Sequence, residues 1–95
     1  MLIETPYKTG DTVSLKLTSG EEVVARLDKE TEKGYELHKP LMLTATQQGV
    51  GLAPFMFTVG ADSKFIINTQ SVVCIAKTEK EAASQYVQTT TGLTV

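Results

Sequence analysis

The chain of 95 residues contains no tryptophan, one cysteine and one histidine. Cys74 cannot form a disulfide within the chain and lies in an apolar run, so we interpret it as a small buried hydrophobic side chain in a reducing compartment. No CxxC, HExxH or P-loop motif occurs, and no serine lies in a nucleophile-elbow sequence. The single histidine, His38, has only Glu36 nearby on the same strand phase. We therefore predict a protein that is not an enzyme and that has no metal or cofactor.

The sequence also lacks a block of like charge and a long hydrophobic run. Its net charge is −2, which argues against the basic face that duplex DNA binding requires. A membrane-spanning helix needs about 20 consecutive apolar residues, and no segment approaches that length. Residues 1–4 show neither a basic region nor a long apolar stretch, so we expect no signal peptide. We expect a cytoplasmic protein.

What the sequence does contain is the alternation of apolar and polar residues that is typical of half-buried strands. Val13, Leu15 and Leu17 alternate with polar neighbours, and a turn ending in Gly20 follows. Pro40 removes a backbone donor from a later run, so we expect an edge position or a bulge there. Three consecutive strands are predicted, over residues 12–17, 22–30 and 35–46.

The second half of the chain completes the predicted sheet. A polar, glycine-rich connection over 46–51 leads to a fourth strand with Phe55, Phe57 and Val59 on one face. Residues 64–67 extend or continue that strand, a polar corner occupies 68–71, and the fifth strand covers 72–76. Five short strands joined by close turns predict an all-β fold, a small closed or nearly closed barrel.

A short helix is expected after the last strand. Thr78 and Glu81 match the capping box, in which the two side chains satisfy the first helical amides. We predict a helix over about 79–87 and a loosely held tail over 88–95. The whole chain, 1–95, forms a single domain with its core in 10–76.

Several apolar residues do not fit a barrel that stays alone in water. In the fifth strand, Val72 and Cys74 are expected on one face and Val73 and Ile75 on the other, so both faces are apolar. On other strands, the side that a lone barrel would leave exposed to water carries four more apolar residues: Val24, Met42, Met56 and Ile66. We expect these surfaces to meet another copy of the chain; the alternative is that the two-sided fifth strand simply lies under the C-terminal helix. The predicted interface consists of Phe55, Phe57, Val72, Val73, Cys74 and Ile75.

These patterns resemble the Sm and Sm-like (LSm/Hfq-type) family over residues 10–76. Val13, Leu15, Leu17 and Gly20, followed by Ala25 and Leu27, are similar to the first Sm motif, and residues 67–75 are similar to the second. The resemblance implies a strongly bent, five-stranded, SH3-like barrel. It further implies pairing of the fourth strand of one subunit with the fifth of the next, in a homo-oligomeric ring of roughly five to seven copies, with single-stranded RNA bound around the pore.

The resemblance also implies an RNA pocket, although its residues differ from the family pattern. Thr31 stands at the position of the family's aspartate. With one extra loop residue, Tyr35 takes the base-stacking position and Glu36 that of the asparagine. Asn68-Thr69 replaces the family's Arg-Gly. A stacked aromatic ring contributes about 1–3 kcal/mol per base. The predicted RNA-binding residues are Tyr35, Glu36, His38, Asn68, Thr69 and Gln70.

Two functions remain open at this point. The first is a ring that binds short single-stranded RNA and assists RNA pairing or turnover. The second is the same barrel acting as an oligomeric scaffold or protein-interaction module without RNA, which Glu36, Asn68 and the acidic balance favour. A monomeric OB-type oligonucleotide binder fits less well, because the few aromatic residues are not interleaved with basic ones.

Overall fold

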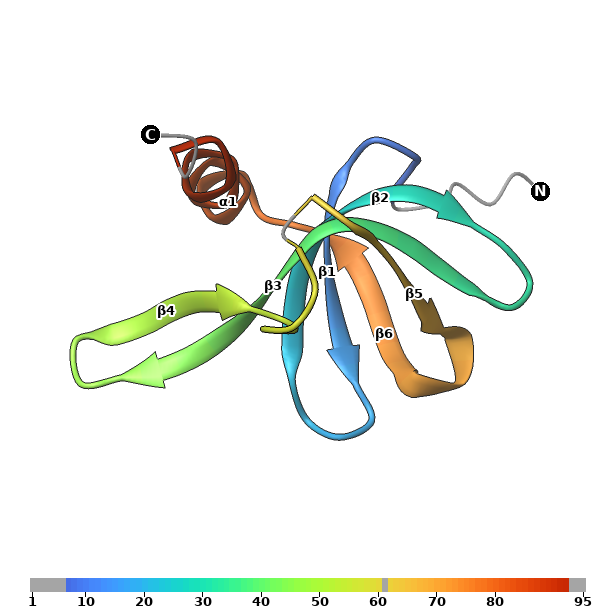
Figure 1. The fold of residues 1–95 in the computed structure, drawn as a ribbon, viewed down its shortest axis with the longest axis horizontal. Coiled ribbons are helices and arrows are strands. Elements are labelled where there is room, and N and C mark those ends of the chain that lie inside the picture. Colours follow the sequence, from blue (N-terminus) through green and yellow to red (C-terminus); the bar gives the residue numbers. More distant parts are fainter. Residues whose placement is uncertain (1–6, 61, 93–95) are drawn as a thin grey trace.

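The computed structural model describes residues 7–60 and 62–92. They form an antiparallel sheet followed by one α-helix (Figure 1). The strands and helices are β1 Thr12–Leu17, β2 Glu22–Glu30, β3 Gly34–Thr46, β4 Gly49–Pro54, β5 Lys64–Asn68, the 3₁₀-helix η1 Thr69–Ser71, β6 Val72–Lys77 and α1 Lys80–Gly92. Within the described residues, no helix is long and apolar enough to cross a membrane. The predicted all-β fold is confirmed, and β1 and β2 have the predicted bounds.

The long strand β3 organises the sheet. The strand order is β4-β3-β2-β1-β6, and β5 also pairs with β3. One edge of β3 is shared, because β4 pairs with residues 41–46 and β5 with residues 34–38. Over the described residues the sheet therefore has six strands and is open, whereas the sequence predicted five strands in a closed or nearly closed barrel. In the part of the chain that the structure describes, β5 pairs only with β3 and β6 only with β1, so each has one unpaired edge.

A bulge in the middle of β3 explains the sixth strand. In the pairing of β3 with β2, His38 faces Arg26 and Leu41 faces Val24. Two residues of β3, Lys39 and Pro40, therefore lie opposite a single residue of β2. Lys39 has the left-handed φ of 52°, which a residue other than glycine adopts at some energetic cost. The bulge expected at Pro40 is confirmed. Near the bulge, the chain leaves the edge of β3 after β4 ends at Pro54 and rejoins that edge as β5 at Lys64.

The prediction of the fourth strand over Phe55–Val59 is wrong. These residues form an irregular loop, and the strand lies earlier in the chain, over β4. The predicted glycine-rich connection is instead a tight hairpin, in which Gly49 has a φ of 125° and the Thr46 hydroxyl donates to the Gly49 carbonyl oxygen at 2.8 Å. A positive φ is accessible to glycine without steric cost, so the chain turns at 47–48 and β4 begins at once.

The core lies on one face of β1, β2 and β3. Alternate residues of each strand point into it, as the period-two pattern predicted. Its buried members are Val13, Leu15, Leu17, Val23, Ala25, Leu27, Leu37 and Ile67. Burial of these side chains supplies the main driving force for folding. Tyr7, Tyr35, Phe55, Val72 and Ile75 pack against this cluster from its margins.

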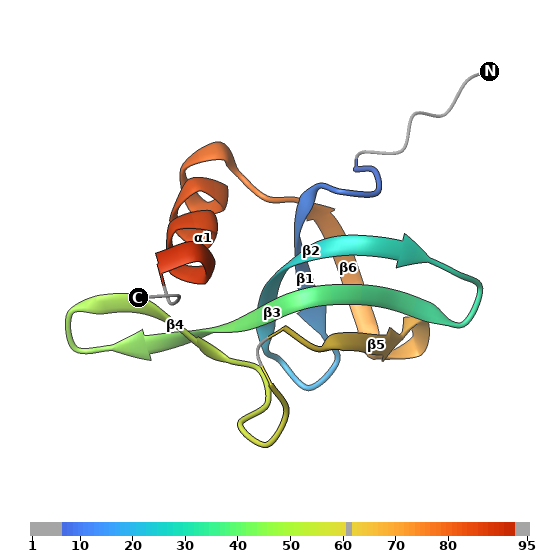
Figure 2. The same cartoon turned by 45° about the horizontal axis from the view of Figure 1, so that its top comes forward.

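Helix α1 covers the opposite face of the sheet beside β3 and β4 (Figures 1 and 2). Tyr86, Val24 and Leu41 form a second buried cluster there. The Tyr86 hydroxyl donates to the carbonyl oxygens of His38 at 3.0 Å and Lys39 at 2.7 Å, which are the carbonyls next to the bulge. Val24 is therefore buried by the chain's own helix, and the prediction that it forms a surface for another copy is wrong.

The predicted helix bounds need correction. The helix begins at Lys80 and continues to Gly92, so residues 88–92 are helical and not a loose tail; residues 93–95 lie outside the described chain. The Thr89 and Thr91 hydroxyls donate to the carbonyls of Gln85 and Val87 within the last turns. Thr78 was expected to cap the helix, but its hydroxyl lies 2.8 Å from the Ser14 hydroxyl of β1 and ties the helix to the sheet.

A second bulge changes the faces of β6. Leu17 faces Val72 and Lys16 faces Cys74, so Val73 is an extra residue in the register. Val72 and Ile75 consequently both pack against the core, while Val73 is 63% exposed and Cys74 is exposed. The prediction that Val72 and Cys74 lie on the same face of the strand is therefore wrong. The prediction that Cys74 is buried is also wrong.

Substitution of Gly34 tests the contact between β3 and β5. A Cβ atom at residue 34 would lie 2.5 Å from the Ile67 carbonyl oxygen, and this backbone atom cannot move without breaking the ladder. We expect Gly34→Ala to lower the free energy of unfolding by at least about 2 kcal/mol, measured by urea denaturation. Gly51→Ala is the matched control, because its Cβ would meet only two side chains at ordinary contact distance, Thr46 at 3.5 Å and Thr44 at 3.6 Å. Equal stability of the two variants would contradict this close approach.

The pH dependence of stability tests the docking of α1. Burial raises the pKa of Tyr86 from 10.0 to about 12. The protonated hydroxyl therefore contributes stability that is complete below pH 10 and is lost as the pH rises from 10 to 12. We expect the stability advantage of the wild type over Tyr86→Phe to fall by about 2 to 3 kcal/mol across this range, measured by urea denaturation at successive pH values. An advantage that does not change with pH would contradict the docking.

Candidate functional site

A polar corner forms where the loop between β2 and β3 meets η1. Gly34 and Asn68 are partners in the ladder, and the Thr69 amide donates to the Lys33 carbonyl oxygen at 3.2 Å. Figure 2 shows the β2–β3 turn and the link from β5 to β6 at the same end of the molecule. Two segments that are more than 30 residues apart in the sequence thus form one surface. We call residues 31–34 and 68–70 the polar corner.

Asn68 fixes the shape of the corner on the η1 side. Its side-chain Oδ1 accepts a hydrogen bond from the Gln70 amide at 2.8 Å, as an N-cap residue does. This bond uses the carbonyl oxygen of the side chain and leaves its NH₂ group to donate elsewhere. Asn68 and Gln70 are exposed and Thr69 is half-buried. The predicted polar turn is confirmed, and its side chains present donors and acceptors to solvent.

Thr31 fixes the shape of the corner on the loop side. Its hydroxyl oxygen accepts hydrogen bonds from the amides of Lys33 and Gly34, each at 3.2 Å, and the Thr31 amide donates to the Gly34 carbonyl at 2.9 Å. A side-chain oxygen that accepts from amides two and three residues later is a common way of closing a short loop. Thr31 therefore has a structural role in the corner.

Tyr35 lies beside the corner, but part of its ring is used in packing. It is half-buried against the core and faces Ile67 across the ladder. Tyr7 is close to it, and the Tyr7 hydroxyl donates to the Glu30 carboxylate at 2.9 Å. Burial, together with the hydrogen bonds of Glu30 and Tyr35, raises the pKa of Tyr7. Only the exposed part of the Tyr35 ring is therefore presented to a ligand.

The structure does not bring Glu36 and His38 into the corner. The Glu36 carboxylate lies 3.6 Å from Lys64 Nζ, which also lies 3.8 Å from Asp28. His38 faces Arg26 on one side and Lys64 on the other, four residues along β3 from Gly34, which corresponds to roughly 13 Å. Both predicted residues thus belong to a mixed-charge strip on β2, β3 and β5. Such partly exposed ion pairs contribute little to stability.

Two residues of the corner were missed by the sequence interpretation. Lys33 is exposed, and its carbonyl accepts the hydrogen bond from Thr69, so the corner includes a cation. Gly34 permits the close approach of the loop to the carbonyl of Ile67. The loop that ends in glycine was visible in the sequence, but its distance from η1 depends on the pairing of β3 with β5.

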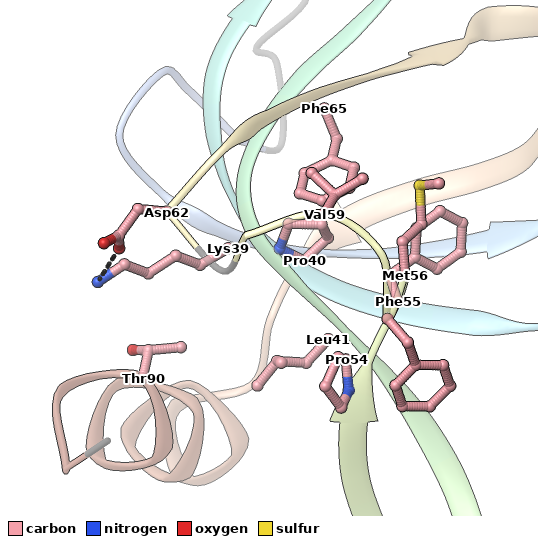
Figure 3. Close-up of a pocket in the computed structure, with 11 residues that line it drawn as sticks. Lys39, Pro40, Leu41, Pro54, Phe55, Met56, Val59, Asp62, Phe65 and Thr90 are labelled. Atoms are coloured by element: carbon pink, nitrogen blue, oxygen red, sulfur yellow. Dashed lines mark ion pairs between the residues drawn. The ribbon is translucent and has the colours of Figure 1, made fainter. Parts of the chain in front are cut away.

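An apolar cavity of about 280 Å³ lies next to the β3 bulge. It is bounded by the bulge, the loop after β4, the start of β5 and the end of α1 (Figure 3). Phe55, Met56 and Phe65 form much of its wall. The ammonium group of Lys39 lies 3.5 Å from the Asp62 carboxylate, and this pair is the charged part of the lining. No sequence motif predicted this cavity.

The six predicted interface residues fall into two groups. Phe55, Val72 and Ile75 are half-buried and pack against the core of their own chain. Phe57 is 82% exposed, Val73 is 63% exposed and Cys74 is exposed. The second group belongs to the loop after β4 and to β6, a strand with an unpaired edge. These three side chains remain available for contact with another molecule.

Comparison with known proteins gives no family assignment, since no family model and no curated protein sequence matches the chain. Within the described ranges 7–60 and 62–92, no group of three or more histidine, cysteine, aspartate or glutamate side chains could hold a metal ion.

Removal of the Thr31 hydroxyl tests how the corner is held. Thr31→Val keeps the shape of the side chain but leaves the amides of Lys33 and Gly34 without their acceptor. We expect the free energy of unfolding to fall by about 1 to 2 kcal/mol and the exchange of these two amides to accelerate, as measured by hydrogen-exchange NMR. Thr31→Ser keeps the acceptor and should retain slow exchange. Unchanged exchange in Thr31→Val would contradict the role of the hydroxyl.

Proposed function

We propose that this chain is an Sm-like protein that forms a homo-oligomeric ring and binds short single-stranded RNA at the polar corner. The observation that carries this proposal is the juxtaposition of the β2–β3 loop with η1, through the ladder pair Gly34–Asn68 and the bond from Thr69 to Lys33. The resemblance of the sequence to the Sm family implies an RNA pocket built from these two segments. The exposed thiol of Cys74 fits a reducing compartment such as the cytoplasm.

The strand order supports the Sm-like barrel and its assembly. β4 and β5 follow one edge of β3 in succession and together take the place of the family's fourth strand, while β6 takes the place of the fifth. The unpaired edges of β5 and β6 offer backbone donors and acceptors to a neighbouring copy. Ile66 on β5 is 74% exposed and Val73 on β6 is 63% exposed, and pairing of the two edges would remove apolar area from water.

The chemistry of the corner suits a nucleobase and its phosphate. The Asn68 amide and the Gln70 side chain can hydrogen-bond to a base edge, and the exposed part of the Tyr35 ring can stack against a base. The Lys33 ammonium supplies the cation for a phosphate oxygen. One cation per copy on a chain of net charge −2 implies modest affinity that weakens as salt is added.

The scaffold function has its own support. Part of the Tyr35 ring packs against the core and is not accessible to a base. Lys64, the cation next to Glu36, already forms ion pairs with Glu36 and Asp28. A ring without accessible aromatic and cationic groups would repel RNA because each copy adds negative charge. In that case the exposed surfaces serve assembly with other proteins alone.

Fluorescence anisotropy with short U-rich and A-rich RNA tests the proposal. Asn68→Asp keeps an oxygen that caps η1 but replaces the NH₂ donor with a negative charge. We expect this variant to bind RNA at least about tenfold more weakly than the wild type, with unchanged thermal unfolding. Gln48→Glu makes the same change of charge at the exposed tip of the β3–β4 hairpin and should bind as the wild type does.

Three results decide between the functions. Saturable binding that is lost in Asn68→Asp and kept in Gln48→Glu supports RNA binding at the corner. Absence of binding at micromolar wild-type protein, with an intact ring in native mass spectrometry, favours the scaffold. A monomer at micromolar concentration contradicts the ring and therefore both functions.

A further inference from the structure

The loop after β4 exposes more apolar surface than the folding of one chain requires. Phe57 is 82% exposed and Met56 is 43% exposed, although their neighbour Phe55 packs against the core. An aromatic side chain is among the largest contributors to an interface when it is buried. A loop that places Phe57 and Met56 together at the surface is thus suited to contact another molecule.

The position of this loop restricts what it meets. The described part of the loop, residues 55–60 and 62–63, precedes β5, whose outer edge pairs with no strand of the described residues. If copies assemble through the edges of β5 and β6, as the proposed function requires, β6 of the next copy lies along β5. Every strand pair within the described sheet is antiparallel. An antiparallel pairing places the beginning of β5, and with it the loop, at the end of the neighbour's β6.

The end of β6 carries a groove. Between Lys77 and helix α1 lies an open hollow of about 560 Å³, lined by Lys77, Lys80, Ala83 and Val87, among others. Val87 is 49% exposed, so the floor of the groove offers apolar area that α1 does not bury against its own sheet. Both charged residues of the lining are cations.

The charges of the loop complement those of the groove. Asp62 follows Phe57 in the loop, and its side chain is 88% exposed. Asp62 already lies 3.5 Å from Lys39 of its own chain, but its exposure leaves room for a second cation. A carboxylate beside Lys77 or Lys80 of the next copy would fix the orientation of the contact, as charge pairs at the rim of an interface do.

We propose that Phe57 of one copy inserts into the groove between β6 and α1 of the next copy, and thereby clasps adjacent subunits beyond the pairing of their strands. This inference rests on the proposed ring and adds a contact to it. The occupant of the groove is a second copy of this chain. The α1 helix then has two roles, because one face covers Val24 and Leu41 while Val87, on another face, receives the neighbour's loop.

Cysteine cross-linking between different copies tests this contact. In a Cys74→Ser background, one protein carries Phe57→Cys and the other Val87→Cys. The two proteins, with different tags, are unfolded together, refolded and oxidised. A disulfide between the two tags joins two copies by necessity. We expect this product at least about tenfold above the product obtained with Val50→Cys in place of Phe57→Cys, since Val50 is 72% exposed but lies on the hairpin.

A second measurement separates the failure of this inference from the failure of the ring. Native mass spectrometry of wild type, Phe57→Ala and Val50→Ala gives the concentration at which each oligomer dissociates. We expect Phe57→Ala to raise this concentration about tenfold or more and Val50→Ala to leave it unchanged. A stable ring with neither the cross-link nor the effect of Phe57→Ala overturns the insertion but keeps the proposed function. A monomeric wild type overturns both.

Discussion

The backbone of β3 at Lys39 and Pro40 is the constraint on which the rest of the structure depends. A proline in the middle of a strand cannot donate to the ladder, and the preceding lysine takes a left-handed conformation. The bulge is stabilised from the helix side, because the Tyr86 hydroxyl donates to the carbonyl oxygens of His38 and Lys39. On the other side, the loop after β4 fills the interruption. The helix, the apolar cavity and the exposed loop thus all adjoin one irregular step in one strand.

The polar corner depends on the first half of β3, before the bulge. There β3 pairs with β5 in unbroken register over residues 34–38. The absence of a Cβ atom at Gly34 allows the two backbones to approach, and the side chains of Thr31 and Asn68 satisfy amides on the two sides of the contact. The corner is therefore held mainly by its backbone and by the side chains of Thr31 and Asn68, while the side chains of Lys33 and Gln70 are exposed.

The sequence predicted the fold where alternation alone decides the structure. The bounds of β1 and β2 follow from the regular placement of apolar residues, and the bulge follows from the chemistry of Pro40. Phe55, Phe57 and Val59 also alternate, but they belong to a loop, because Gly49 makes the earlier hairpin possible and the edge of β3 is interrupted. Strict alternation predicts Val72 and Cys74 on one face of β6, but the extra residue at Val73 shifts the alternation by one position. Such a bulge depends on the partner strand and has no local signature.

For the candidate site, the polar segment 68–71 was predictable and its neighbours were not. The sequence indicated Asn68, Thr69 and Gln70 as a polar turn, and the family resemblance added the β2–β3 loop. The resemblance also placed Glu36 at the position of the family's asparagine, and His38 shares the strand phase of Glu36. Neither argument says how far along β3 from the corner a side chain lies. The position of Lys33 next to Thr69 depends on the register between β3 and β5, which no pattern within either segment determines.

The bulges in β3 and β6 and the attachment of β6 by one edge divide the molecule into parts of unequal stability. Among the described residues, β6 is joined to the rest of the sheet only through β1, and the Thr78 hydroxyl contacts Ser14 of that same strand. Separation of β1 from β6 would therefore loosen the root of α1 as well, so that strand and helix open as one cooperative unit. A neighbouring strand on the outer edge of β6 would close that route, and assembly would then contribute to the rigidity of each copy.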